Sequence, residues 1–79
     1  MNYNIKEDEG HNLATTWVTF SDDTTVYFEI NLEETTSDSD LIISKITDCV
    51  NKDNTVWNED GTNILTKTIT SLSDTQPTQ

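Results

Sequence analysis

The sequence predicts an α+β fold, a small antiparallel sheet of about four strands in ββαββ order with one helix packed on one face. Three observations lead to this prediction. Two segments alternate apolar and polar residues with the period of a strand, and a third places its apolar residues at helical spacing. Near the end of the chain, Asp60-Gly61 lies between two further strand-like segments and is typical of a tight hairpin turn.

The first predicted hairpin joins residues 13–20 to residues 26–33. Threonine, valine and aromatic residues fill the first segment, which suits a pleated strand. The second segment alternates more cleanly, and its inward face is expected to carry Val26, Phe28, Ile30 and Leu32. Residues 21–25 have the composition of a turn, so we expect the two strands to pair antiparallel.

Residues 40–51 favour a helix. At about 100° per residue, one sector of the helix collects nearly all the apolar side chains, with Leu41 outside it. These are Ile42, Ile43, Ile46, Cys49 and Val50. Residues 34–39 supply candidate N-caps, and the lysines late in the segment suit the helix dipole. The β-branched isoleucines leave a strand over residues 41–46 as the alternative.

The second predicted hairpin spans residues 55–66. A two-residue type I′ turn at Asp60-Gly61 would place Trp57 opposite Ile64 and Val56 opposite Leu65. The second strand could continue through residues 67–71. We expect both tryptophans, Trp17 and Trp57, to anchor the core beneath their hairpins, although one of them could instead be an interface hot spot.

The chain is expected to form a single domain over residues 13–70, flanked by a polar N-terminal arm (1–12) and a polar C-terminal tail (71–79). The arm has only Tyr3 and Ile5 as anchors, and a short edge strand is its alternative. Only 32% of the 79 residues are apolar, and the single cysteine permits no internal disulfide. We therefore expect the fold to depend on a partner surface.

The charge balance excludes some classes of partner. Fifteen Asp and Glu residues face four lysines and no arginine, which gives a formal net charge of −11. No basic patch can contact nucleic acid directly or an anionic membrane. The start of the sequence lacks the features of a secretory signal, and the longest apolar run, residues 41–43, is too short to span a bilayer. We expect a protein of the virion or the host cytoplasm, because the lack of arginine and the frequent Asn, Ile and Lys suit an AT-rich phage genome.

Residues that could carry chemistry are sparse. His11 is the only histidine, and no motif connects it to Cys49 or to a serine. Cys49 is expected to be a small core residue rather than a reactive thiol. The acidic clusters lack the ligand spacing of a calcium loop. The sequence therefore predicts no enzyme activity, no cofactor and no metal site.

Two functions remain. The first is a structural or accessory subunit that docks on a larger assembly, such as a phage virion, through edge strands and polar arms. The alternative is an acidic inhibitor that imitates nucleic acid and blocks a basic nucleic-acid-binding host protein. In both cases the partner is a protein. The candidate partner-binding residues are Asp22, Asp23, Glu29, Glu33, Glu34, Asp38 and Asp40.

Overall fold

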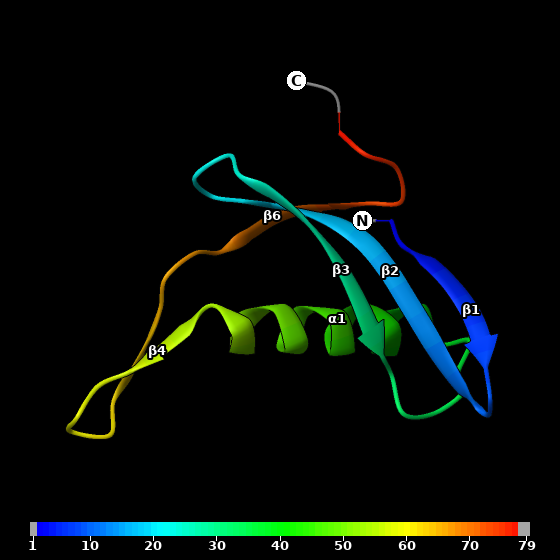
Figure 1. Cartoon of the computed structure of the whole chain (residues 1–79), viewed down its shortest axis with the longest axis horizontal. Coiled ribbons are helices and arrows are strands. Elements are labelled where there is room, and N and C mark those ends of the chain that lie inside the picture. Colours follow the sequence, from blue (N-terminus) through cyan, green and yellow to red (C-terminus); the bar gives the residue numbers. More distant parts are fainter. Residues whose placement is uncertain (1, 78–79) are drawn as a thin grey trace.

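The computed structural model describes residues 2–77, so Met1, Thr78 and Gln79 of the expected arm and tail lie outside the described residues. The elements follow in the order β1 (Asn4–Asp8), β2 (His11–Phe20), β3 (Thr25–Asn31), α1 (Ser39–Asp53), β4 (Thr55–Trp57), β5 (Asn63–Leu65) and β6 (Ile69–Ser73) (Figure 1). The predicted α+β class, with a four-stranded antiparallel sheet and one helix, is confirmed. The predicted ββαββ order is wrong, because three strands precede the helix.

The central strand of the sheet is β2, which pairs with all three of the other strands. β3 runs antiparallel along one flank, where Thr19 lies opposite Thr25 and Leu13 opposite Asn31. On the other flank, β1 pairs with residues 11–15 and β6 with residues 17–20, so these two strands follow one another along β2. The hairpin predicted from residues 13–33 is therefore present. Because β1 and β6 share one side of β2, the four-stranded sheet is three strands across at any point.

The gap between β1 and β6 is closed by the side chain of Thr16, which is fully buried. Its hydroxyl lies 3.1 Å from the carbonyl oxygen of Asn2 and 3.2 Å from that of Ser73. The N–H of Asn2 also donates to the carbonyl of Leu72 at 3.0 Å. The sequence predicts that residues 4–8 and 69–73 belong largely to a polar arm and a polar tail. In the structure both segments form strands, and the two strands meet at this point.

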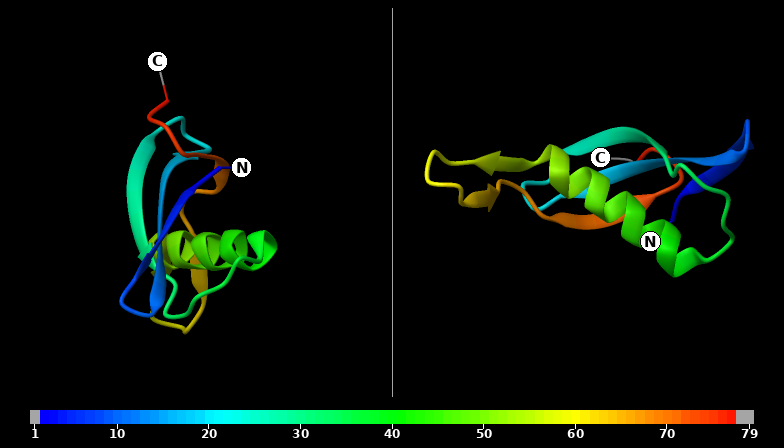
Figure 2. Two further views of the ribbon diagram at one scale, coloured as in Figure 1. Left: turned by 90° about the vertical axis from the view of Figure 1, so that its right-hand side faces the viewer. Right: turned by 90° about the horizontal axis from the view of Figure 1, so that it is seen from below.

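The core lies between α1 and the face of the sheet that α1 crosses (Figure 2). Every second residue of β2 from Ala14 to Phe20 is buried there, together with residues of β6 and of β3 and its C-terminal end. The buried apolar side chains are Ala14, Val18, Phe20, Ile30, Leu32, Ile42, Ile46, Val50 and Leu72. The alternation along β2, in which every second side chain is buried, is expected for a sheet with one covered face.

The helix begins where Asp38 caps it, as the candidate N-caps predicted. The Asp38 carboxylate accepts the N–H groups of Asp40 at 3.1 Å and Leu41 at 3.3 Å. Ile42, Ile46 and Val50, spaced four residues apart, form the buried line. Cys49 is exposed, so the expectation that it is a core residue is wrong. It precedes Val50 by one position, which rotates it about 100° away from the buried line.

The second hairpin is present, but its predicted register is wrong by one residue. Val56 pairs with Ile64 and Trp57 with Asn63. The N–H of Gly61 donates to the carbonyl of Asn58 at 3.1 Å, and Gly61 has a φ of +86°. Three residues, 59–61, therefore form the loop, a type I turn followed by a left-handed glycine, in place of the two-residue turn. The strand after it ends at Leu65, and β6 turns away to join β2.

Neither tryptophan is a core anchor, so that expectation is also wrong. Trp17 is half-buried on the sheet face opposite the helix, where its ring lies 5.0 Å from that of Tyr27. The even-numbered residues of β2 occupy the core face, which leaves Trp17 on the other one. Trp57 is 68% exposed.

Candidate functional site

The most exposed large apolar side chains lie on the hairpin formed by β4 and β5. They are Trp57 (68% exposed), Ile64 (56%) and Val56 (51%), and together with Leu65 (40%) of the same hairpin we call them the hairpin patch. Val56 and Ile64 face each other on one side of the two-stranded ribbon, whereas Trp57 and Leu65 belong to the other side. The ribbon extends beyond the end of α1 and away from the sheet (Figure 1). Both sides of the ribbon therefore expose apolar side chains, which makes it a candidate interaction surface.

Hydrogen bonds at both ends hold the hairpin in shape. At its tip, the N–H of Asn58 donates to the Thr62 carbonyl at 2.8 Å, and the Asp60 carboxylate accepts the N–H of Thr62 at 3.0 Å. The Thr62 hydroxyl and N–H together lower the pKa of Asp60. At its base, the Thr66 N–H and hydroxyl donate to the carbonyl of Asn54, the C-cap of α1, at 2.9 and 2.8 Å. The hairpin is thus fixed to the end of the helix.

The acidic candidate residues at the start of β3 are Asp22 and Asp23, which lie in the β2–β3 turn. The Asp22 carboxylate accepts hydrogen bonds from the hydroxyl and N–H of Thr24 and lies 3.2 Å from the ammonium of Lys67. These contacts, the Thr24 hydroxyl first, lower the pKa of Asp22 from 3.8 to about 2. Asp22 therefore stabilises the turn, and Lys67 neutralises part of the local charge.

Most of the remaining acidic candidates lie beyond the other end of β3. Glu33 and Glu34 follow the strand, Asp38 caps α1 and Asp40 is in its first turn. The Glu34 carboxylate lies 3.9 Å from the ammonium of Lys45. Only Glu29 occupies the strand itself, and the seven residues of β3 span roughly 23 Å at the rise of an extended chain. The structure thus places the seven candidates in two groups with one residue between them.

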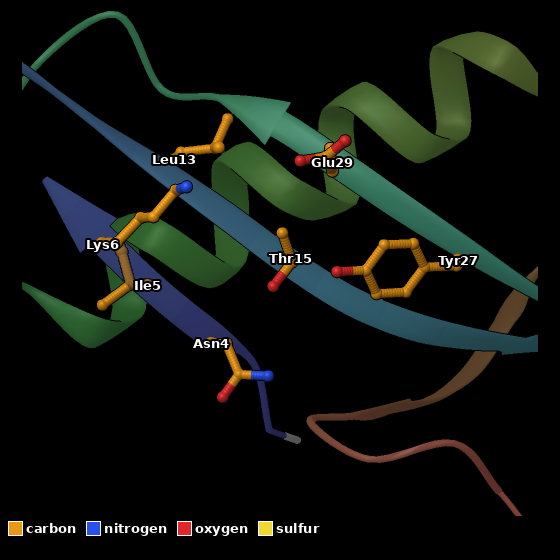
Figure 3. A pocket seen from close by; sticks show the side chains of 7 residues that line it. All are labelled: Asn4, Ile5, Lys6, Leu13, Thr15, Tyr27 and Glu29. Atoms are coloured by element: carbon orange, nitrogen blue, oxygen red, sulfur yellow. The ribbon is translucent and has the colours of Figure 1, made fainter. Parts of the chain in front are cut away.

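A groove of about 280 Å³ separates the outer edge of β3 from α1. Its lining comes from the end of β3 and from one side of the helix: Ile30, Asn31, Leu32, Glu33, Lys45, Asp48 and Cys49. On the opposite face of the sheet, Tyr27 and Glu29 of β3 border a second hollow of about 250 Å³ with residues of β1 and β2 (Figure 3). The second hollow thus lies over β2, between β1 and β3, whereas the groove lies beside the outer edge of β3.

The two residues considered for catalysis lie on different elements. His11 begins β2 opposite Asp8, and Cys49 is on an exposed position of α1. Within residues 2–77, no hydrogen bond joins either side chain to another residue. No group of three His, Cys, Asp or Glu side chains that could hold a metal ion occurs in this part of the chain. The same residues contain no helix that is long and apolar enough to cross a membrane.

Sequence reasoning did not identify the hairpin patch as a surface, because it assigned Trp57 to the core. The only signal for it was the tryptophan itself, a residue type enriched at interfaces. Alternation of apolar and polar residues along a strand cannot reveal whether the apolar face of a hairpin is covered by the rest of the protein. No protein-family model, curated protein or solved structure matches this chain.

Proposed function

We propose that this protein is a non-enzymatic interaction subunit that docks on a larger protein assembly, such as a virion, through the hairpin patch. The observation that supports this proposal is the exposure of Trp57 and its three apolar neighbours on a hairpin fixed to α1. Burying these side chains against a partner is favourable in proportion to the apolar area removed from water. The fixed base also reduces the ordering cost of binding.

Charge indicates the chemistry of the partner. Glu59 and Asp60 lie at the tip of the hairpin, and the whole chain has a formal net charge of −11. A partner with an apolar groove and a basic rim would therefore associate with this hairpin faster than an uncharged partner would, and in one orientation. A second copy of the chain would bring the same negative charge and repel it.

The test is affinity capture from the source cells or particles with matched variants. Trp57→Ser and Ile64→Ser remove exposed apolar side chains from the hairpin, whereas the controls Ile5→Ser and Leu41→Ser remove them from β1 and α1. We expect each hairpin variant to weaken binding by roughly thirtyfold, the effect of losing a hot-spot side chain of about 2 kcal/mol. The controls should bind as the wild type does. Equal binding by all four variants would contradict the proposal.

The alternative function, an inhibitor that imitates nucleic acid, has weaker support because its acidic residues fall into two groups along β3 rather than one ridge. It predicts salt-sensitive binding to a basic DNA- or RNA-binding protein. Changing Asp22, Asp23, Glu29 and Glu33 together to lysine should then abolish binding. A partner that binds this variant with unchanged affinity would exclude mimicry by these four residues.

A further inference from the structure

The backbone of β3 is free along its outer edge. The hydrogen bonds from Phe20 N–H to the Thr24 carbonyl and from Leu32 N–H to the Asn12 carbonyl fix which residue pairs of the β2–β3 ladder are hydrogen-bonded. Since such pairs alternate, Val26, Phe28 and Ile30 bond to β2, and the odd-numbered residues point their N–H and C=O groups outward. Within residues 2–77, no backbone group bonds to these outward groups of Thr25, Tyr27, Glu29 and Asn31.

This edge lacks the usual protection against strand pairing. Charged side chains commonly guard exposed edges, and β1 has Lys6, Glu7 and Asp8 among its five residues. β3 has Glu29 as the only charged residue among its seven. It also contains no proline, and its C-terminal end lies beside the groove that α1 lines. The β3 edge is therefore open to a further strand.

The groove between β3 and α1 can receive alternate side chains of such a strand. On the helix side, the groove offers Ile30, Leu32 and Cys49, an apolar floor with carboxylates at its rim. On the other face of the sheet, the side chains of Tyr27 and Glu29 are both exposed, whereas the second hollow lies further in, over β2 (Figure 3). An added strand would point one set of side chains into the groove and the other set toward Glu29.

We propose that the β3 edge binds an extended segment of a partner protein by strand addition, with apolar residues facing the α1 groove and lysine or arginine facing Glu29. The lining of the groove includes two carboxylates, Glu33 and Asp48, and one lysine, Lys45, whose ammonium already lies 3.9 Å from Glu34, so it favours a segment of positive net charge. Main-chain hydrogen bonds supply affinity in this mode, and the alternate side chains supply specificity. This surface is separate from the hairpin patch and can bind whether or not the hairpin docks.

The probe is a capped peptide of alternating valine and lysine. Its control has the same sequence with N-methyl groups on the residues that would bond to β3, which keeps the charge and side chains, removes the peptide's N–H donors and places methyl groups between the two strands. We expect the first peptide to slow hydrogen exchange at the N–H groups of Tyr27 and Glu29. It should also slow alkylation of Cys49, which lies in the groove and is the only cysteine. The N-methylated peptide should do neither.

Two variants of Glu29 separate the backbone contribution from the charge. Glu29→Pro removes one outward N–H and leaves the bonds to β2 intact, a position where edge strands tolerate proline. Glu29→Gln removes only the charge. We expect Glu29→Pro to weaken peptide binding by roughly tenfold relative to Glu29→Gln, because one edge hydrogen bond and its register are lost.

Three results would overturn the proposal. Equal binding of the N-methylated peptide would show that charge alone attracts the probe. Binding without protection of the Tyr27 and Glu29 N–H groups would place the probe elsewhere. Protection of these groups that rises with protein concentration in the absence of peptide, with a dimer in sedimentation, would identify a second copy as the occupant. The peptide comparison uses the wild-type chain, so it decides the question even if Glu29→Pro fails to fold.

Discussion

Replacing Ile46 and Ile64 separately by alanine removes the same three carbon atoms from two different environments. Ile46 lies on the helix face that packs against the sheet and is 0% exposed, whereas Ile64 lies on the hairpin and is 56% exposed. Both substitutions leave the charge unchanged. Any difference in their effect on the free energy of unfolding therefore reports how each site is packed.

The structure gives the expected magnitudes. A buried isoleucine replaced by alanine costs about 2–5 kcal/mol, since a cavity remains. Full burial of an isoleucine is worth about 1.5–3 kcal/mol, and Ile64 has slightly less than half of its surface covered. Solvent fills the space that its side chain leaves, so we expect Ile64→Ala to cost about 1 kcal/mol or less. A chain of this length has a total stability of about 4–12 kcal/mol, so Ile46→Ala alone removes a large part of it.

Urea unfolding followed by far-ultraviolet circular dichroism measures both changes, with the slope of the transition as a check that the unfolded states are comparable. If Ile46→Ala does not fold, Ile46→Val replaces it, with an expected loss of about 0.5–1.5 kcal/mol. A loss for Ile64→Ala as large as that for Ile46→Ala would refute the reasoning. It would mean that the hairpin is buried in solution, against the core or against another copy.

Further predictions concern the cap, the charges and the tryptophans. Asp38→Ala should cost about 0.5–2 kcal/mol in urea unfolding because it leaves two helix N–H groups unpaired, and Asp38→Asn should restore most of the loss. The Asp22 carboxyl should titrate near pH 2 by carbon NMR. Its pKa in the folded protein lies below the usual 3.8 of an aspartate, so its stabilising contribution is complete above pH 3.8 and is lost as pH falls through about 2. A midpoint near 3.8 would contradict the Thr24 and Lys67 contacts. Sodium chloride should raise the urea midpoint, because screening weakens repulsion within a chain of net charge −11, and an unchanged midpoint would argue against this repulsion. Acrylamide should quench Trp57, measured in Trp17→Phe, more strongly than Trp17, measured in Trp57→Phe; similar quenching would mean that Trp57 is covered.

The parts of the fold that the sequence predicted are those with a local signal. Alternation along β2 and β3 identified the two strands and their turn, and Asp38 before an apolar helical pattern identified the start of α1. β1 carries little apolar signal because it is an exposed edge strand held by main-chain hydrogen bonds, which any sequence can make. The pairing of β6 with β2 joins distant segments, and nothing local indicates it.

The errors at the second hairpin have two physical causes. Asp-Gly suits both a two-residue type I′ turn and a three-residue turn with a left-handed glycine. In the structure, the bonds from Thr62 to Asp60 and from Asn58 to Thr62 accompany the second arrangement. The exposure of Trp57 has a different origin, because burial depends on what covers a strand and not on the strand itself. For the same reason, neither the hairpin patch nor the free edge of β3 could be predicted from the sequence, because both depend on how the elements are arranged in space.

The meeting of β1 and β6 beside Thr16 also governs how the protein can be made. Thr16 and Ser73 are 57 positions apart, so β6 must emerge from the ribosome before the sheet can close. At about 5–20 residues per second, β6 is synthesised roughly 3–11 s after β2. During that interval Val18 and Phe20 lack the cover of Leu72. The nascent chain therefore presents an open strand edge to chaperones, or to other nascent chains, before it presents any finished surface to a partner.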